Sequence, residues 1–166
     1  GYKTFAYYYE IPEADAKFIV ERYHSVYPGI RGGYHRWIKD QLSRDRTITN
    51  AYGRRRKFLD RWGAGLFEDV YAFFPQSTVA DKMNREGHAF ILNNQQWFHS
   101  LEPLNEVYDS IWYQIPLSKG TQYHADCLMR VRDSLESPIS WKSREFVIPT
   151  DAKMWLSFGH TLDFKY

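Results

Sequence analysis

The hydrophobic positions of this chain recur mainly at intervals of three and four residues, which is the period of an amphipathic helix. Residues 1–10 are predicted to form a short helix. Pro12, followed by acidic residues, is typical of a helix start, and Pro28-Gly29 is typical of a helix end. A second helix is therefore expected between them. Its buried face is predicted to consist of Ala16, Ile19, Val20, Tyr23, Val26 and Tyr27.

Helical spacing continues in four later segments. The first starts at Ile30, and its inward residues are expected to be Tyr34, Trp37 and Ile38. Residues 65–73 are predicted as a separate short helix. Residues 75–98 are predicted as a long one, because proline and hydroxyl residues favour the first turn of a helix. A last helix is expected over residues 120–137.

One stretch is instead typical of β-structure. Residues 104–117 (LNEVYDSIWYQIPL) are dense in β-branched and aromatic residues, which favour a pleated backbone. Asp109-Ser110 interrupts the run, and Asp is a good turn residue because its carboxylate accepts hydrogen bonds from nearby amides. We therefore expect a hairpin with its turn at Tyr108-Asp109. The carboxylate at its tip is either an ordinary solvated turn residue or part of a site completed elsewhere.

Two other segments complete the predicted strands. Residues 46–60 indicate a second hairpin, whose turn is expected to carry a cluster of three arginines and a lysine. Residues 146–148 are predicted as a third strand, in one small antiparallel sheet with the hairpin of residues 104–117. The fold class is therefore α+β, mostly helical, in a single domain of residues 1–166. The tail from Thr150 carries no clear pattern.

Composition narrows the class of protein. A chain of 166 residues is long enough for one domain with a substantial core. No apolar run approaches the roughly 20 residues of a membrane span, and no basic-then-apolar leader begins the sequence, so we expect a cytoplasmic protein without membrane contact. The single cysteine, Cys127, cannot form an internal disulfide.

Basic residues are concentrated in one part of the chain. Ten Lys or Arg lie between Arg31 and Arg61, against three Asp, although the net charge of the whole chain is only +2. A local excess of this kind suits a polyanion. A solvated helix face followed by a basic loop accounts for it equally well, so both interpretations stay open.

Five segments of the chain form an ordered set: IPEADAKFIVERYHSVYPG (11–29), TNAYGRRR (49–56), PQSTVAD (75–81), VYDS (107–110) and REFVIP (144–149). Taken together, they resemble the C-terminal half of family A DNA polymerases, the DNA polymerase I type, and most closely their bacteriophage members. The resemblance implies a right-hand polymerase fold. Residues 1–62 would then be trailing fingers helices with a basic hairpin, and residues 63–166 the palm with its motif C hairpin.

The resemblance also implies roles for individual residues. VYDS matches motif C, in which Asp109 would be one of two catalytic aspartates that bind a pair of Mg²⁺ ions. Gln76 matches a glutamine that touches the duplex near the primer terminus, where Tyr108 is expected as a hydrogen-bond donor to phosphate. The residues expected on backbone phosphates are Arg54, Arg55 and Arg56.

Three residues depart from the family pattern, which reads Gln-Val-His-Asp-Glu at motif C. Tyr108 replaces the histidine and cannot carry a positive charge. Glu106 replaces the glutamine, so a negative charge stands where an amide would meet DNA. We expect Glu106 either to weaken that contact or to have a metal or lysine partner. Ser110 removes the second acid of the motif.

The motifs A and B of the family have no counterpart in this chain. One carboxylate cannot hold two Mg²⁺ ions, so the chain alone is expected to be inactive. The resemblance implies that it is a C-terminal subunit of a split polymerase, or a fragment of a longer one, with a complementary chain, primer-template DNA and a dNTP as partners. Residues expected at the interface with that chain are Phe5, Tyr7, Tyr8 and Tyr9.

Two other functions are compatible with the sequence. The chain can be a non-catalytic DNA-binding or scaffold module derived from a polymerase, which the changes at Glu106 and Tyr108 favour, whereas Asp109 and Gln76 favour the enzyme. A small hydrolase is the third interpretation. Nothing in the spacing supports it, because the histidines share no nucleophile or metal-ligand pattern.

Overall fold

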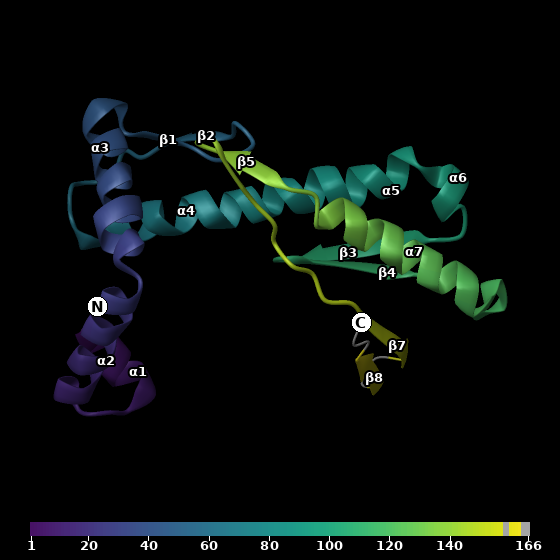
Figure 1. Cartoon of the computed structure of the whole chain (residues 1–166), viewed down its shortest axis with the longest axis horizontal. Coiled ribbons are helices and arrows are strands. Elements are labelled where there is room, and N and C mark those ends of the chain that lie inside the picture. Colours follow the sequence, from purple (N-terminus) through teal and green to yellow (C-terminus); the bar gives the residue numbers. More distant parts are fainter. Residues whose placement is uncertain (158–159, 164–166) are drawn as a thin grey trace. The chain divides into compact units, whose positions relative to one another are not determined.

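Helices dominate the computed structural model, in which residues 1–157 and 160–163 are described (Figure 1). In this part of the chain the strands form four two-stranded sheets, so the predicted α+β class is confirmed. The backbone contacts divide the chain into two compact units. The first consists of Gly1–Ile48 and Arg55–Ala72, and the second of Thr49–Arg54 and Phe73–Tyr166. The assignment of residues 1–62 to fingers and 63–166 to palm stays a prediction.

The first unit begins with a pair of packed helices, α1 (Tyr2–Tyr9) and α2 (Glu13–Val26). Helix α1 ends at Glu10, which has a left-handed backbone, and Pro12 immediately precedes α2 as predicted. The predicted buried face of α2 is wrong. Of the residues expected there Ala16 is fully buried, whereas Tyr23 is 50% and Val26 54% exposed. The spacing gives a helix with an apolar face, but no element of this unit covers most of that face.

Helix α3 (Arg36–Asp45) follows a π-helical turn, η1 (Ile30–His35), that contains the Gly32-Gly33 pair. Ile38 and Leu42 of α3 are buried, so the predicted inward position of Ile38 is confirmed. The helix ends at Arg46, whose φ of 58° is left-handed. The Nε of Arg46 donates to the carbonyl oxygen of Phe58 at 2.7 Å. This bond ties the end of α3 to the chain that returns from the first hairpin.

The β1–β2 hairpin consists of β1 (Thr47–Thr49) and β2 (Arg55–Lys57), which confirms the prediction for residues 46–60. Asn50 organises its turn, because its Oδ1 accepts from the backbone amides of Tyr52 at 3.0 Å and Arg54 at 2.9 Å. The expected cluster of basic residues in the turn is wrong. Arg54 follows the turn, and the other three basic residues form β2 itself, because the side chain of Asn50 closes the turn before they are reached.

One helix, α4 (Ala64–Lys82), contains the short helix predicted over residues 65–73 and the start of the long helix predicted over residues 75–98. The prediction of a helix start at Pro75 is wrong. A proline inside a helix removes the hydrogen bond to the carbonyl four residues earlier, here that of Tyr71. That carbonyl oxygen accepts instead from the hydroxyl of Tyr34 at 2.7 Å. Tertiary structure thus supplies the donor that the proline lacks, and the helix continues.

The second unit contains the main hydrophobic core. After α4 the chain continues through the π-helical turn η2 (Met83–His88), α5 (Ala89–Asn93) and α6 (Gln95–Phe98). Helix α7 (Gly120–Leu135), preceded by the short η3 (Leu117–Lys119), packs along η2 and α5 (Figure 1). The buried core residues are Met83, Ile91, Phe98, Leu101, Cys127, Val131 and Leu135. The helix predicted over residues 120–137 is therefore confirmed.

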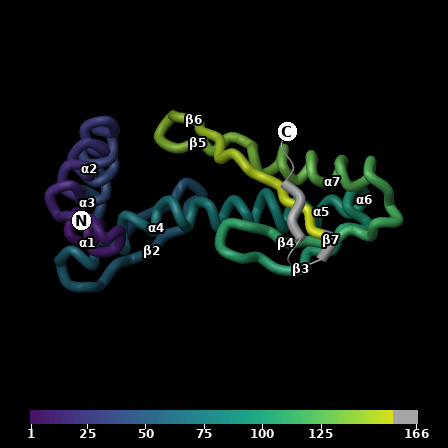
Figure 2. Tube along the Cα trace, turned by 90° about the horizontal axis from the view of Figure 1, so that it is seen from below, coloured from purple at the N-terminus to yellow at the C-terminus, as the bar shows by residue number. Residues whose placement is uncertain are grey.

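The strands β3 (Glu102–Val107) and β4 (Ser110–Gln114) form the β3–β4 hairpin, with its turn at Tyr108-Asp109 as predicted. The third strand predicted at residues 146–148 is wrong. The segment that follows α7 instead forms its own antiparallel hairpin. Its strands are β5 (Ile139–Trp141) and β6 (Arg144–Phe146) (Figure 2). Lys142 and Ser143 between them both have positive φ, as in a tight hairpin turn. Neither residue is glycine or asparagine, so the sequence carries no turn signal there.

The tail, from which no structure was predicted, forms a further antiparallel pair, β7 (Lys153–Ser157) and β8 (His160–Asp163). The indole of Trp155 lies against that of Trp112 in β4, with ring centroids 5.3 Å apart. None of the described helices is both long enough and apolar enough to cross a membrane.

Candidate functional site

The tip of the β3–β4 hairpin presents two side chains to solvent. Tyr108 has a φ of 55°, a left-handed backbone that tight turns require, and its side chain is 92% exposed. Asp109 is exposed beside it. Asp109 is not buried against apolar neighbours, so its carboxylate is accessible to a ligand that approaches the tip.

Ser110, which stands where the family pattern has a second acid, closes the turn instead. Its hydroxyl donates to the carbonyl oxygen of Val107 at 2.8 Å and accepts from the indole Nε1 of Trp112 at 3.2 Å. Val107 and Ser110 are also the last cross-strand pair before the tip. The serine therefore fixes the geometry of the turn and leaves Asp109 as the single acid of the tip.

At the base of the tip, Glu106 pairs with a histidine. Its Oε2 lies 3.2 Å from Nε2 of His88 in η2, and both side chains are partly buried. A lysine or a metal was expected as the partner of Glu106, and the structure gives His88 instead. The residue next to His88, Gly87, lies so close to Ile111 of β4 that an added Cβ would come within 2.2 Å of its Cδ1 atom.

The described residues do not form a complete Mg²⁺ site. No three His, Cys, Asp or Glu side chains gather closely enough to hold a metal ion anywhere in the described chain. Magnesium requires near-octahedral oxygen ligation, which it usually completes with carboxylates, water and substrate phosphates. Asp109 offers one such ligand, and the remaining ligands would have to come from outside the described residues.

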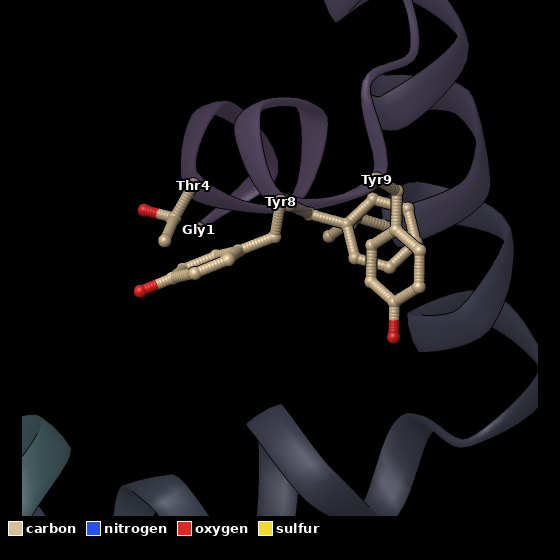
Figure 3. Close-up of a pocket in the computed structure, with 6 residues that line it drawn as sticks. Gly1, Thr4, Tyr8 and Tyr9 are labelled. Atoms are coloured by element: carbon tan, nitrogen blue, oxygen red, sulfur yellow. The ribbon is translucent and has the colours of Figure 1, made fainter.

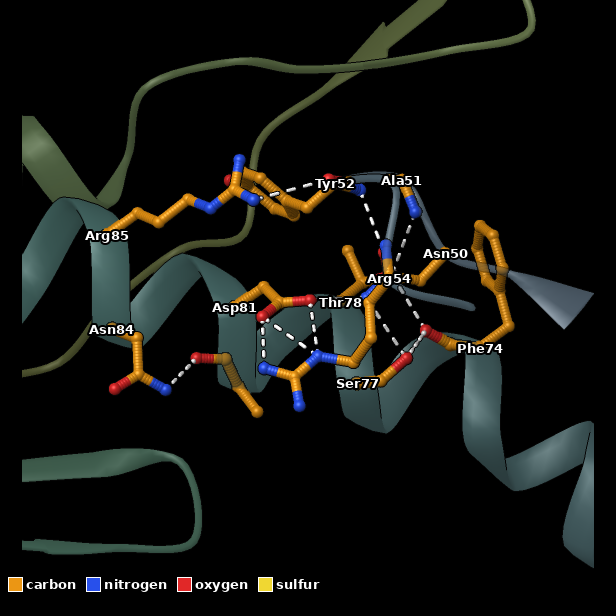
Figure 4. Close-up of polar contacts among 11 residues, drawn as sticks. Asn50, Ala51, Tyr52, Arg54, Phe74, Ser77, Thr78, Asp81, Asn84 and Arg85 are labelled. Atoms are coloured by element: carbon orange, nitrogen blue, oxygen red, sulfur yellow. Dashed lines mark hydrogen bonds and ion pairs between the residues drawn. The ribbon is translucent and has the colours of Figure 1, made fainter. Parts of the chain in front are cut away.

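Arg54 is anchored to α4 by Asp81. Its Nε lies 3.0 Å from each carboxylate oxygen of Asp81, and the Asp81 side chain is almost completely buried (Figure 4). The hydrogen bond from Arg54 holds the pKa of the Asp81 carboxyl below its usual value despite burial. Asn50 donates to the same carboxylate at 2.6 Å. Arg54 thus fastens the turn of the β1–β2 hairpin to the helix, and its contact with phosphate stays a prediction.

The other predicted DNA-binding residues are exposed. Arg55 and Arg56 lie in β2 together with Lys57, and all three are open to solvent. The guanidinium of Arg56 lies over the ring of Phe58, with 4.6 Å from Cζ to the ring centroid. Gln76 is exposed on α4, one residue after Pro75. Arg55 and Arg56 belong to the first unit, whereas Gln76 and Asp109 belong to the second.

A buried polar network in the second unit was not predicted. Lys82 is 2% exposed and donates to Glu86 and to the carbonyl oxygen of Ser137 at 2.7 Å. Glu86 also accepts from the hydroxyls of Ser137 at 2.6 Å and Tyr52 at 2.7 Å. Burial raises the pKa of Glu86, but these hydrogen bonds outweigh it and the net shift is downward. No local pattern marks these residues, because they come from three distant segments.

The N-terminal aromatic residues surround an open hollow on α1 and α2 (Figure 3). Phe5 and Tyr9 pack against each other, with ring centroids 4.6 Å apart. Tyr7 and Tyr8 are largely exposed. This surface is apolar and accessible, and its use as a partner interface stays a prediction.

No protein-family model matches this chain, and no curated protein matches it either.

Proposed function

We propose that this chain is the C-terminal subunit or fragment of a family A DNA-directed DNA polymerase, and that it acts in nucleotidyl transfer together with a chain that carries motifs A and B. The observation that carries the proposal is the accessible carboxylate of Asp109 at the tip of a tight hairpin turn. It coincides with the motif C position in a series of five segments that resemble the family in order. A solvated turn residue alone would not account for the other four segments.

In this proposal Asp109 contributes one oxygen ligand to a metal site that the other chain completes. The Mg²⁺ ions would supply charge stabilisation for the attacking and leaving oxygens of the transferred phosphoryl group. The role of this chain is to hold that carboxylate on a turn with little freedom, because Ser110 bonds Val107 and Trp112 on either side of it. Tyr108, at the same tip, would donate its hydroxyl to a phosphate oxygen.

The proposal also assigns the exposed strand β2 to DNA. Arg55, Arg56 and Lys57 present three positive charges in succession, which suits the backbone phosphates of a primer-template and reads no sequence. Gln76 would contact the duplex near the primer end. Both assignments rest on side chains that are open to solvent, and none of the ion pairs among the described residues involves Arg55.

A primer-extension assay tests the proposal when the chain is combined with the polypeptide that supplies motifs A and B. Asp109→Ala should reduce extension by several orders of magnitude, because a metal ligand is removed. Asp133→Ala is the matched control, since Asp133 is an exposed carboxylate on α7. Extension that is unchanged by Asp109→Ala would refute the catalytic role.

A non-catalytic DNA-binding or scaffold module is the second candidate. The observation that favours it is that the described residues gather no set of metal ligands around Asp109. The same assay separates the two functions if primer-template binding is measured alongside. A scaffold predicts binding that survives Asp109→Ala, with no extension by either protein.

A further inference from the structure

Two consecutive residues of η2 contact the β3–β4 hairpin at one cross-strand pair. Glu106 in β3 and Ile111 in β4 lie directly opposite each other in the register of the hairpin. His88 contacts Glu106, and Gly87 lies under Ile111. The next pair towards the tip is Val107 with Ser110, and the Tyr108-Asp109 turn follows. The hairpin is therefore held one pair below the turn that carries Asp109.

The support that holds the hairpin is itself fixed in the core. Met83 at the start of η2 is buried among the core residues. Glu86 accepts from Lys82 through its side chain and from the hydroxyl of Ser134 in α7 through its carbonyl oxygen, at 2.7 Å. A Cβ built on Gly87 would lie 2.2 Å from Cδ1 of Ile111, which is a clash, and 3.4 Å from Cδ2 of Leu135, which is an ordinary contact, so the lack of a side chain at Gly87 lets the hairpin approach this turn. The core therefore holds the η2 turn in place, and the contacts of η2 with the hairpin fix the position of the hairpin.

The contact with Glu106 is close and partly buried. Nε2 of His88 and Oε2 of Glu106 are 3.2 Å apart, and the two side chains are only 22% and 27% exposed. A partly buried pair is screened less by solvent than an exposed one. An isolated two-stranded hairpin is marginally stable in water, so its position depends on contacts with its support.

We propose that His88 is a positioning residue that fixes the Tyr108-Asp109 turn through Glu106, with Gly87 as the close contact that sets the distance between hairpin and η2. This inference rests on the proposed function for its consequence, which is the placement of the Asp109 carboxylate. It also gives Glu106 a role: the carboxylate that replaces the amide of the family pattern is paired with a histidine from η2 and is not a free charge facing DNA.

Amide hydrogen exchange on the full chain tests the positioning. His88→Ala and Glu106→Ala should each raise the exchange rates of the Val107 and Ser110 amides about 5- to 10-fold, as expected when the contact between the two side chains is lost. The double variant should exchange no faster than the faster single variant. His88→Gln, which keeps an N–H donor, should restore most of the protection. Amides in the middle of α7 serve as the internal control.

The inference would be overturned if both single variants left the exchange rates at the tip unchanged. It would also be overturned if the double variant raised these rates by the product of the two single effects. If His88→Ala fails to fold by circular dichroism, Glu106→Gln provides a milder version of the same test. It keeps the size of the side chain but removes the charge, and it should give a smaller rise in the same two rates. Equal protection in Glu106→Gln and the unmodified chain would show that the Glu106 carboxylate does not hold the turn.

The consequence for Asp109 is measured separately in the complex with the polypeptide that supplies motifs A and B, with Mn²⁺ as the probe, from paramagnetic broadening of the amides next to Asp109. His88→Ala should weaken this broadening at a given Mn²⁺ concentration at least 2-fold, and His88→Gln should restore it. If the unmodified chain shows no broadening near Asp109, the metal role in the proposed function fails while the exchange rates still decide the positioning. Broadening that His88→Ala leaves unchanged would instead overturn the positioning alone.

Discussion

The hydroxyl of Tyr34 donates, at 2.7 Å, to the carbonyl oxygen of Tyr71, the carbonyl that Pro75 leaves without a donor inside α4. This bond joins residues that are 37 positions apart in the sequence. The ring of His35 stacks on the ring of Tyr71, with centroids 3.9 Å apart. The end of η1 thus packs against α4 at the turn where the proline interrupts its hydrogen bonds.

Tyr34→Phe should lower the free energy of unfolding by about 1–2 kcal/mol, because the Tyr71 carbonyl then has no donor in a partly buried place. Urea denaturation followed by circular dichroism measures the change. Tyr7→Phe is the matched control, since Tyr7 is 80% exposed, and it should be neutral. In the background Pro75→Ala, which restores the amide donor, the effect of Tyr34→Phe should shrink. Equal effects in both backgrounds would contradict the explanation of the continuous helix.

The Arg54–Asp81 pair predicts how stability depends on pH. The folded pKa of Asp81 lies below its usual value of 3.8, so the ionised carboxylate stabilises the fold above that value. This contribution disappears as pH falls through the lower, folded pKa. Thermal unfolding between pH 2 and 6 should therefore show acid destabilisation that is weaker in Arg54→Ala, which is already less stable at pH 6. Arg55→Ala is the control and should keep the acid dependence of the unmodified chain.

Lys82→Met should lower the free energy of unfolding by about 3–5 kcal/mol, since it removes the cation from a buried pair and leaves the Glu86 carboxylate with hydroxyl partners alone. The matched control is Lys17→Met, because Lys17 and Glu21 are also four residues apart but exposed. We expect the control to change stability by less than about 0.5 kcal/mol. Chemical denaturation measures both. Similar decreases in the two variants would mean that burial does not strengthen the Lys82–Glu86 pair.

The exposed basic strand predicts salt-dependent binding of primer-template DNA. The slope of log K against log salt should become shallower by about two units in the double variant of Arg55→Ala and Arg56→Ala, because each arginine is expected to neutralise one backbone phosphate. Fluorescence anisotropy at several salt concentrations measures the slope. A double variant of Lys3→Ala and Arg22→Ala, two basic residues on α1 and α2, should leave it unchanged. Binding that is indifferent to salt would refute the assignment of β2 to phosphates.

The local elements could be predicted where short-range preferences decide the structure. Asp109 marks the turn of the β3–β4 hairpin, because a short polar pair between two β-branched and aromatic runs leaves few alternatives. The helix start predicted at Pro75 was wrong, because the frequent position of proline in the first turn of a helix is only a statistical preference. The hydroxyl of Tyr34 offsets the part of the cost inside α4 that comes from the missing amide donor. The hairpin at residues 139–146 was missed, because its turn uses Lys142 and Ser143.

The sequence by itself determined the helices up to residue 45 and the last helix, both hairpins up to residue 114 and the exposed acid at one hairpin tip, because these depend on residues that are neighbours along the chain. Tertiary structure decided which groups pair. Arg54 with Asp81, and His88 with Glu106, are separated by 27 and 18 positions. Such pairs depend on how elements pack in space, so no local pattern of hydrophobic and polar residues specifies them.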